Sequence, residues 1–472
     1  MAIGGLFIDG RWSTGSHTVT ITDNFTGREV AKAEQATASQ TEQALDSLAA
    51  GLSQAVIPAY ERYEILTRAS AGLIARRAEL IDLAIGETGF THSDLDDEIN
   101  RAIQTLSASA EEAKRLVGEM VPLEGAPGVL NRIGYTIRVP VGIVCSITPF
   151  NSPINTLCHK LGPAIAAGNS VIVKPSSFSP LSASAVVEIL LEAGLPSDRI
   201  ALVNGSSKEI GPTLLEDERI GFYAFTGSTE TGRVVREKAG LRRTALELGG
   251  LSSTIVCEDA DLHLAAERCV TGAFRKAGQV CTSVQRLYVH DAIYDQFVDA
   301  LVASAGPRVT GDPRDPATFV GPMISSAEAA RVAAWIDDAI QGGARRVIGG
   351  EPEGMLLHPT ILEDVDMTMN VMCREVFGPV MSLRRYSDLQ STVDEINSTP
   401  YGLAAGAFTQ DLTKAHLLAR SLRMGTVHIN QTSSSRIDIM PYGGVKDSGY
   451  GKEGPRYAIK EMTEERLVTM SF

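Results

Sequence analysis

The fold class follows from residues 170–205, SVIVKPSSFSPLSASAVVEILLEAGLPSDRIALVNG. The short apolar run at 170–175 is typical of a strand that is buried on both faces. Apolar residues then repeat at helical spacing over 181–196, and RIALVNG (199–205) predicts the next strand. Strand, helix and strand in this order predict an α/β protein with a parallel, doubly wound sheet.

The same alternation extends to both sides of this stretch. TIRVPVGIVCSITPF (136–150) and IGFYAFTG (220–227) are rich in residues that favour strands, and 37–115 repeats apolar residues at helical spacing. A second α/β stretch, which contains STIVCE and RLYVH, begins after Gly250. We therefore expect a domain boundary at ELGGLSS (247–253).

Composition excludes several classes of protein. The chain has 472 residues, 44% of them hydrophobic and 21% charged, as in ordinary globular proteins. Lys and Arg number 43 and Asp and Glu number 57, a net charge of −14, so we expect no nucleic acid and no membrane as partner. Six scattered cysteines and the lack of a signal peptide predict a cytoplasmic protein. No Cys/His cluster is present, so we expect no metal.

Glycine-rich turns are candidate sites for a dinucleotide, whose pyrophosphate needs backbone N–H groups at a helix N-terminus. The G-x-G-x-x-G fingerprint is absent, and FTGSTETG (225–232) is a looser version with Gly227 and Ser228 at a strand-to-helix turn. Ser228 is equally suited to cap a helix without any ligand. Lys174 ends the strand VIVK, where its partner is either a ribose or phosphate, or water.

Three polar residues are candidate catalytic groups. Cys281 lies in the polar turn GQVCTS, whereas the other five cysteines have apolar or helical surroundings. A partly exposed thiolate beside a base is a nucleophile, and Glu247 is the candidate base. Asn151, between two prolines, is a candidate donor to an oxyanion. Structural roles stay open for all three. Cys281 could be a buried, unreactive thiol, Glu247 could be bonded to the backbone amides of a turn, and Asn151 could cap a turn.

Taken together and in order, these motifs resemble the aldehyde dehydrogenase superfamily. The motifs are TPFNSP, VIVKPSSFSP, FTGSTETG, LELGG, GQVCTS, EVFGPV and MPYGGVKDSGYG. The resemblance extends from FIDGRW (7–12) to the last expected strand. It implies an oxidoreductase that converts an aldehyde to a carboxylic acid with NAD or NADP.

The resemblance also implies a domain arrangement. Residues 1–121 and 141–249 would form the cofactor-binding domain around a doubly wound parallel sheet, and 250–440 an α/β catalytic domain. Residues 122–140 and 456–472 would form a small β oligomerisation element of a homodimer or homotetramer. From its β-prone sequence alone, the tail is either a strand added to another subunit's sheet or an edge strand of its own domain.

Residue roles carry over from the family motifs. Cys281 would attack the aldehyde and form a thiohemiacetal and then a thioester. Asn151 and the backbone N–H of Cys281 would form the oxyanion hole, and Glu247 would activate the hydrolytic water. The expected cofactor contacts are Thr148, Pro149, Phe150, Lys174, Ser176, Gly227, Ser228, Glu375 and Phe377.

One departure from the family pattern concerns the choice of cofactor. Many members have K-P-S-E, in which the glutamate binds the adenosine ribose and opposes a 2′-phosphate. This chain has Ser177 at that position. Without the negative charge, we expect NADP to be accepted and slightly favoured over NAD.

The resemblance is closest to members that act on lactaldehyde, phosphonoacetaldehyde and small acidic aldehydes. Arg101, His159 and Arg436 align with substrate positions, and Thr282 and Tyr442 are expected to shape the same pocket. A guanidinium group suits a carboxylate, phosphate or phosphonate. We therefore expect a small anionic aldehyde as substrate.

Other interpretations remain open at this point. Arg436 paired with Asp438 would only brace a loop, and Arg101 would then be a surface charge. A neutral or aromatic aldehyde would be the substrate in that case. The other classes are a non-catalytic relative and a CoA-acylating enzyme, which the presence of Glu247 disfavours.

Overall fold

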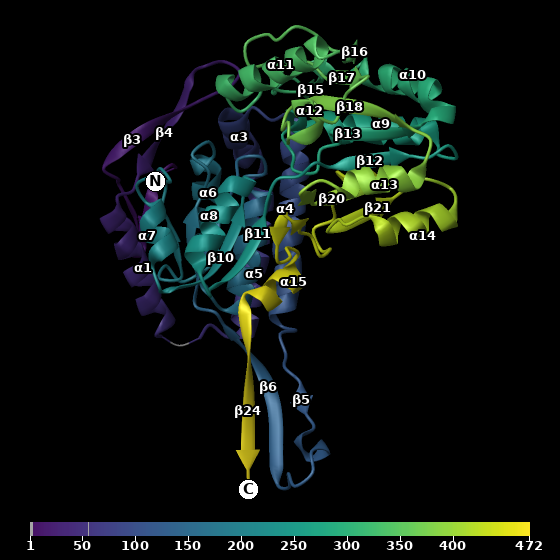
Figure 1. The fold of residues 1–472 in the computed structure, drawn as a ribbon. Helices are drawn as coiled ribbons and strands as arrows, with labels where there is room; N and C mark the ends of the chain where they lie inside the picture. Colours follow the sequence, from purple (N-terminus) through teal and green to yellow (C-terminus); the bar gives the residue numbers. More distant parts are fainter. Residues whose placement is uncertain (1–2, 55) are drawn as a thin grey trace.

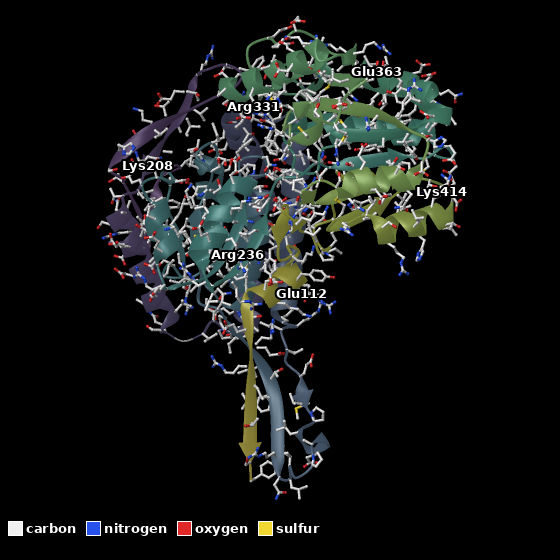
Figure 2. The ribbon with its side chains drawn as sticks, viewed as in Figure 1. Glu112, Lys208, Arg236, Arg331, Glu363 and Lys414 are labelled. Carbon is white, nitrogen blue, oxygen red and sulfur yellow. The ribbon has the colours of Figure 1, made fainter. Side chains whose placement is uncertain are left out.

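Two α/β units and a projecting three-stranded arm make up the computed structural model, which describes residues 3–54 and 56–472 (Figure 1). Each unit is built on its own sheet, and the arm contains the C-terminal strand. Figure 2 shows the side chains on this ribbon, with Arg236 on a helix of the first unit and Lys414 on a helix of the second.

The first sheet has five parallel strands at its centre, in the order β9-β8-β7-β10-β11. Antiparallel strands extend it at both edges, β1 and β2 at one and β23 at the other. The strands are β1 (Leu6–Ile8), β2 (Arg11–Ser13), β7 (Ile143–Ile147), β8 (Ser170–Lys174), β9 (Ile200–Leu202), β10 (Ile220–Thr226), β11 (Arg243–Glu247) and β23 (Gly449–Tyr450).

Helices cover both faces of this sheet, as expected for a doubly wound fold. Alternate residues of a strand point to opposite faces. Val171 and Val173 of β8 thus pack in one apolar cluster with α2–α6, while Ile172 packs in another with α1, α7 and α8. The helices are α1 (Ala38–Leu52), α2 (Ala59–Ala75), α3 (Arg77–Thr88), α4 (His92–Ala113), α5 (Asn155–Ala167), α6 (Pro180–Glu192), α7 (Gly211–Glu216) and α8 (Thr229–Ala239).

The chain passes into the second unit through residues 248–252, between β11 and β12. The second sheet has the order β16-β17-β18-β13-β12-β20-β21 and is parallel except for β16. Its strands are β12 (Ser253–Val256), β13 (Arg286–His290), β16 (Arg345–Ile348), β17 (Thr360–Glu363), β18 (Val380–Tyr386), β20 (Ala404–Phe408) and β21 (Thr426–Ile429). Its helices are α9 (Leu262–Phe274), α10 (Tyr294–Ala305), α11 (Ser326–Gln341), α12 (Asn370–Cys373), α13 (Leu389–Asn397) and α14 (Leu412–Ser421).

Short elements complete the fold. They are the pairs β3 (His17–Thr22) with β4 (Glu29–Gln35), β14 (Val309–Thr310) with β15 (Thr318–Val320) and β19 (Tyr401–Gly402) with β22 (Val445–Lys446), the 3₁₀ turns η1 (Leu123–Gly125), η2 (Arg275–Gly278) and η3 (Asp291–Ile293), and α15 (Pro455–Glu461). Among the residues described, no helix has both the length and the apolar character needed to span a membrane.

The arm joins the tail to an internal strand of the same chain. β24 (Thr463–Ser471) pairs antiparallel with β6 (Arg132–Pro140) along its whole length, and β5 (Met120–Val121) pairs with the other edge of β6. Ile137 on β6 and Leu467 on β24 are exposed. The tail is therefore a strand of its own chain's sheet, and its expected role in oligomerisation stays a prediction.

Candidate active site

A cavity of about 390 Å³ lies where the carboxyl ends of β7, β8, β10 and β11 meet the second unit. Open parallel sheets bind ligands at this edge. The cavity brings together the three candidate catalytic residues and all the candidate cofactor contacts. They are Cys281, Glu247, Asn151, Thr148, Pro149, Phe150, Lys174, Ser176, Ser177, Gly227, Ser228, Glu375 and Phe377.

The turn before Cys281 has an unusual backbone. Lys276 and Ala277 both have φ of +52°, and Gly278 has φ of +68°. A Cβ at Gly278 would lie 2.0 Å from the carbonyl oxygen of Gly378, so only glycine fits there. The Lys276 ammonium group donates to the Asn151 carbonyl at 2.9 Å and pairs with Glu98, which fixes the turn against the first unit.

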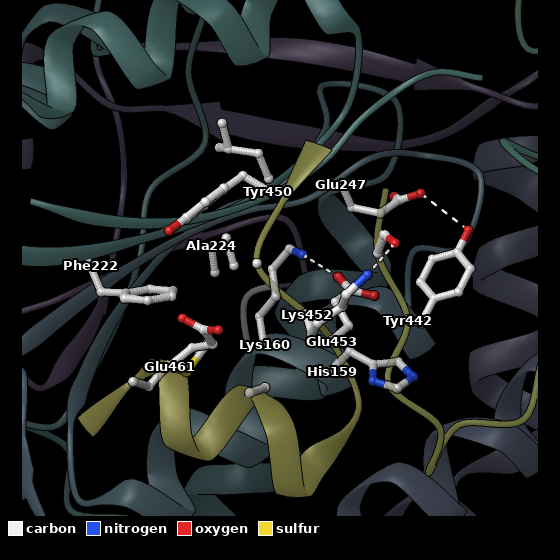
Figure 3. A pocket seen from close by; sticks show the side chains of 16 residues that line it. His159, Lys160, Phe222, Ala224, Glu247, Tyr442, Tyr450, Lys452, Glu453 and Glu461 are labelled. Atoms are coloured by element: carbon white, nitrogen blue, oxygen red, sulfur yellow. Dashed lines mark hydrogen bonds and ion pairs between the residues drawn. The ribbon is translucent and has the colours of Figure 1, made fainter. Parts of the chain in front are cut away.

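Cys281 and Glu247 lie on either side of the Tyr442 hydroxyl. Sγ of Cys281 is 3.2 Å from Oη of Tyr442. The same hydroxyl donates to Oε1 of Glu247 at 3.4 Å (Figure 3). Burial raises the pKa of the Cys281 thiol and of the Glu247 carboxyl, and the negative charge of Glu453 raises the latter further. The sequence left two roles open for Glu247, a base and a carboxylate bonded to the backbone N–H groups of a turn. Among the described residues, no backbone N–H donates to this carboxylate.

Asn151 is fixed beside the nucleophile turn. Its Nδ2 donates to the carbonyl oxygen of Gln279 at 3.0 Å, and Gln279 precedes Cys281 by two residues. An amide nitrogen has two hydrogens. One is engaged with Gln279, and the second remains as a donor within the cavity that Cys281 also lines.

Glu375 and Phe377 approach the cavity from the second unit. Oε1 of Glu375 accepts from the N–H of Gly250 at 3.1 Å, and burial raises the pKa of this carboxyl to about 7. A Cβ at Gly249 would lie 2.4 Å from Glu375, so the glycines of LELGG make this approach possible. Phe377 has φ of +49°, and its ring packs edge-on against Phe150 at 5.9 Å.

The opposite end of the cavity suits an anion. Lys174 makes no ion pair among the described residues, and its Nζ donates to the Pro175 carbonyl at 3.4 Å. Burial lowers the pKa of Lys174, and Ser177 beside it is exposed. Oγ of Ser228 accepts from the N–H of Thr231 at 3.3 Å, so Ser228 caps α8 and lines the cavity at the same time. A dinucleotide fits this combination of a free cation, hydroxyl groups and a helix N-terminus.

A second cavity, of about 300 Å³, contains two of the expected substrate residues. It is lined by Asp94, Asp97, Glu98, Asn100, Arg101, Gln104, Arg275, Lys276, Ser434 and Arg436. The loop brace considered above is not formed: Arg436 pairs with Glu453 at 2.7 Å, and Asp438 pairs with Arg101 instead. Nε of Arg436 is buried without a hydrogen-bond partner in the described chain.

Of the expected substrate residues, His159, Thr282 and Tyr442 line neither of these cavities. His159 is 1% exposed, and its Nε2 contacts Asp438 at 2.9 Å. Burial lowers the pKa of His159, and Arg436 adds to this effect, which favours the neutral imidazole. Thr282 is also buried, and its carbonyl accepts from Ser433 at 3.0 Å. The structure thus places His159 and Thr282 behind the cavity walls.

Arg275 is a candidate that the sequence analysis missed. It lies on the cavity wall, and its Nη2 donates to Oγ and to the carbonyl of Ser434, at 3.0 and 3.3 Å. In residues 3–54 and 56–472 it makes no ion pair. Its position in the same turn as Cys281 was the available signal in the sequence.

Comparison with known proteins identifies the family. The sequence profile of the aldehyde dehydrogenase family matches residues 12–468. The 3-sulfolactaldehyde dehydrogenase of Priestia megaterium is 45% identical over 467 residues, which cover 99% of this chain and 98% of that protein. The chain belongs to the aldehyde dehydrogenase family.

Solved structures agree with this assignment. Aldehyde dehydrogenase 21 from Physcomitrella patens, in complex with succinate, is 35% identical with a TM-score of 0.96, covering 99% of this chain and 98% of that one. The NADP-dependent glyceraldehyde-3-phosphate dehydrogenase from Bacillus halodurans, in complex with NADP, is 33% identical with a TM-score of 0.97, and each chain is covered completely. The protein is an oxidoreductase that converts an aldehyde to a carboxylic acid with NAD(P). The predicted family, fold class and enzyme class are confirmed.

Proposed function

We propose that this enzyme oxidises a small aldehyde that bears an anionic group, with Cys281 as nucleophile. Attack of Sγ on the aldehyde carbon gives a thiohemiacetal, whose oxyanion accepts from Nδ2 of Asn151 and the N–H of Cys281. Bound NAD(P)⁺ supplies the hydride acceptor. Glu247 then takes a proton from the water that hydrolyses the thioester.

The cofactor contacts that we propose follow the cavity from end to end. Glu375 accepts from the nicotinamide ribose, and Phe377 lies against the ring. Lys174 and Ser176 bind the adenosine ribose, Gly227 and Ser228 the pyrophosphate, and Thr148, Pro149 and Phe150 line the channel between them. Ser177 leaves room for a 2′-phosphate beside Lys174, so NADP is slightly favoured over NAD.

One observation carries the anionic substrate: the guanidinium groups of Arg101, Arg275 and Arg436 line the second cavity, and each keeps a donor that no carboxylate accepts from among the described residues. Arg275 has no carboxylate partner among the described residues, and Nε of Arg436 is buried and unsatisfied. Arg101 uses Nε and one terminal nitrogen for Asp438, which leaves Nη1. An unpaired buried donor is costly, and a substrate anion removes that cost.

The choice among anions is supported by the relatives. The similarity to the 3-sulfolactaldehyde dehydrogenase of Priestia megaterium covers 99% of this chain. The aldehyde in that protein's name carries a sulfonate, an anion of the same kind as the carboxylate, phosphate and phosphonate expected from the sequence. A sulfonate presents three oxygens to guanidinium donors. Among these anions, we propose 3-sulfolactaldehyde as the first to test.

The test compares two aldehydes that differ only in the anion. Reduced cofactor is followed at 340 nm with 3-sulfolactaldehyde and with lactaldehyde, each with NADP and with NAD. Succinic semialdehyde, glyceraldehyde 3-phosphate, propanal and benzaldehyde extend the series. We expect kcat/KM to be at least about tenfold higher for the anionic member of the pair, because a hydrogen bond to a charged group contributes about 1.5–3 kcal/mol and about 1.4 kcal/mol corresponds to a tenfold change. Equal values would contradict the anionic substrate and favour a neutral one.

The same assay separates the hydrolytic enzyme from a CoA-acylating one. Turnover without CoA is the expected result, because Glu247 activates water. Turnover that requires CoA would contradict the role of Glu247 as the hydrolytic base. Mutating Cys281 to Ala is expected to abolish oxidation of every aldehyde in the series.

We also propose that the arm mediates a homodimer or homotetramer. Its sheet leaves Ile133, Ile137, Leu467 and Met470 exposed, and exposed apolar strands favour association. Sedimentation velocity is expected to give a mass of two or four chains, and a Leu467→Lys variant to shift it toward one. A monomeric wild type would contradict this. A cytoplasmic location remains a prediction from the cysteines.

A further inference from the structure

Tyr442 is fixed in place from several sides. Its backbone N–H donates to the carbonyl of Glu453 at 3.2 Å, and its own carbonyl accepts from the N–H of Glu453 at 2.6 Å. The guanidinium group of Arg436 lies 3.9 Å above the ring. The side chain is only 2% exposed, so the hydroxyl has little freedom to leave its position.

The hydroxyl of Tyr442 is within hydrogen-bond distance of both the proposed nucleophile and the proposed base. Oη is 3.2 Å from Sγ of Cys281 and 3.4 Å from Oε1 of Glu247. A phenol has one hydrogen to donate, and an ionised carboxylate only accepts. The hydroxyl therefore donates to Glu247 and accepts from the thiol. Figure 3 shows its bond to Glu247.

We propose that Tyr442 is a catalytic residue that transfers the proton of Cys281 to Glu247. This inference rests on the proposed roles of Cys281 and Glu247. The S–H bond breaks and its proton joins Oη, while the original proton of Oη moves to Oε1 of Glu247. The products are a thiolate, a carboxylic acid and an unchanged phenol. Glu247 releases the proton to solvent before it activates water.

A phenol at this position also stabilises the thiolate directly. After the transfer, Oη–H donates either to the new thiolate or to Glu247, and a hydrogen bond to an ionised sulfur favours the charged form. Burial raises the pKa of Tyr442, so the phenol keeps its proton near neutral pH and stays a donor. Phenylalanine preserves the ring and removes both functions.

Other charges around Tyr442 also affect the thiol. Arg436 lowers the pKa of Cys281, whereas Glu247 and burial raise it. The groups that face this region come from β11, η2, α5 and the loops on both sides of Tyr442, and they are Glu247, Arg275, His159, Lys160, Arg436, Asp438 and Glu453. A Tyr442→Phe change leaves each of these groups in place, so its effect isolates the hydroxyl.

Alkylation of Cys281 by iodoacetamide tests the proposal without cofactor or aldehyde. Cys373 is exposed and the remaining four cysteines are buried, so a Cys373→Ser background makes Cys281 the reactive thiol. The rate is measured from pH 6 to pH 10. We expect Tyr442→Phe to move the midpoint up by about one pH unit, which makes alkylation about tenfold slower at pH 7. kcat falls in parallel, while KM changes little.

Tyr223→Phe is the matched control. Tyr223 is as buried as Tyr442, but its hydroxyl donates to the carbonyls of Leu214 and Leu215, away from Cys281. This variant is expected to keep the wild-type alkylation profile. An unchanged profile in Tyr442→Phe, or a midpoint that moves down, would overturn the proposal.

The transfer to Glu247 has its own test. Because Glu247 raises the pKa of the Cys281 thiol, Glu247→Gln alone is expected to speed alkylation. If the proton passes through Tyr442, Tyr442→Phe slows alkylation less in the Glu247→Gln background than in the wild type. Effects that multiply independently would overturn the transfer. If the chain oxidises no aldehyde, the proposed function fails, but the alkylation profile still reports on this contact.

Discussion

Arg101 donates two hydrogen bonds to Asp438, from Nε at 3.0 Å and from Nη2 at 2.8 Å. Asp438 also accepts from Asn155 at 3.0 Å and contacts His159 at 2.9 Å. Its pKa lies far below the ordinary range, although burial acts in the opposite direction, because these donors stabilise the charged form. One carboxylate thus connects α4, α5 and the loop that contains Arg436.

Removing this carboxylate is expected to destabilise the protein. Asp438→Ala removes the carboxylate that Arg101 and Asn155 bond to and leaves Nε2 of His159 with only Thr105, at 3.3 Å, a loss of about 3–5 kcal/mol in the free energy of unfolding. Urea unfolding followed by tryptophan fluorescence measures the change. Glu216→Ala breaks an exposed pair with Lys238 and serves as control, with no shift expected. Equal midpoints for the two variants would show that Asp438 is not a structural centre.

Arg275→Gln is expected to affect only charged substrates. The change removes the one guanidinium in the second cavity that has no carboxylate partner among the residues described. KM for 3-sulfolactaldehyde or another preferred anionic aldehyde should rise roughly 10- to 100-fold, the effect of a lost hydrogen bond to a charged group. KM for lactaldehyde should stay the same. A similar rise for both would assign Arg275 a structural role through Ser434.

Ser177→Glu is expected to reverse the cofactor preference. A carboxylate beside the adenosine ribose repels a 2′-phosphate and accepts from a free 2′-hydroxyl. We expect kcat/KM with NADP to fall about tenfold or more, and kcat/KM with NAD to be equal or higher. Steady-state kinetics with both cofactors gives the ratio. A uniform loss with both cofactors would mean that Ser177 does not face the 2′-position.

The pH dependence of turnover should report on Glu247. Burial raises the pKa of this carboxyl, so as pH falls toward that pKa the base becomes protonated and hydrolysis of the thioester slows. kcat is therefore expected to decrease toward acidic pH. In Glu247→Gln, kcat should drop by ~10²–10⁴-fold. Rapid-mixing experiments should still show a burst of reduced cofactor equal to the number of sites, because without the charge of Glu247 the Cys281 thiol loses its proton to solvent and acylation continues.

A burst that is absent in Glu247→Gln would place the loss before the thioester. A kcat that keeps its acid limb in this variant would show that another group titrates. The second outcome would point to Glu375, whose pKa is raised to about 7 by burial.

Local sequence was enough to predict the centre of the first sheet. β8, α6 and β9 coincide with the apolar run, the helical repeat and the strand expected between 170 and 205. Cys281 lies in a polar turn, Asn151 in a loop between prolines and Glu247 at the end of an apolar stretch, and local sequence left structural roles open for all three. The order of the family motifs along the chain favoured the catalytic roles. The structure brings these three residues to one cavity.

Contacts between distant segments could not be predicted. β1 and β2 have three residues each and β23 has two, too few for a periodic pattern to emerge. Arg101 and Asp438 are separated by 337 residues, and Cys281 and Tyr442 by 161. Pairing of Arg436 with Asp438 was an open alternative because the two are close in sequence, but the loop turns the guanidinium group of Arg436 toward Glu453.

The pairing of β24 with β6 has a consequence for synthesis on the ribosome. Asp438, Tyr442, Glu453 and β24 follow β6 and Lys160 by more than 270 residues and so leave the ribosome later. Until then β6 has no partner along one edge, and Lys160 lacks the carboxylate with which it pairs at 3.0 Å. A chain that stops early in this region would therefore be an inactive product with an unpaired strand edge, open to aggregation, rather than a slower enzyme.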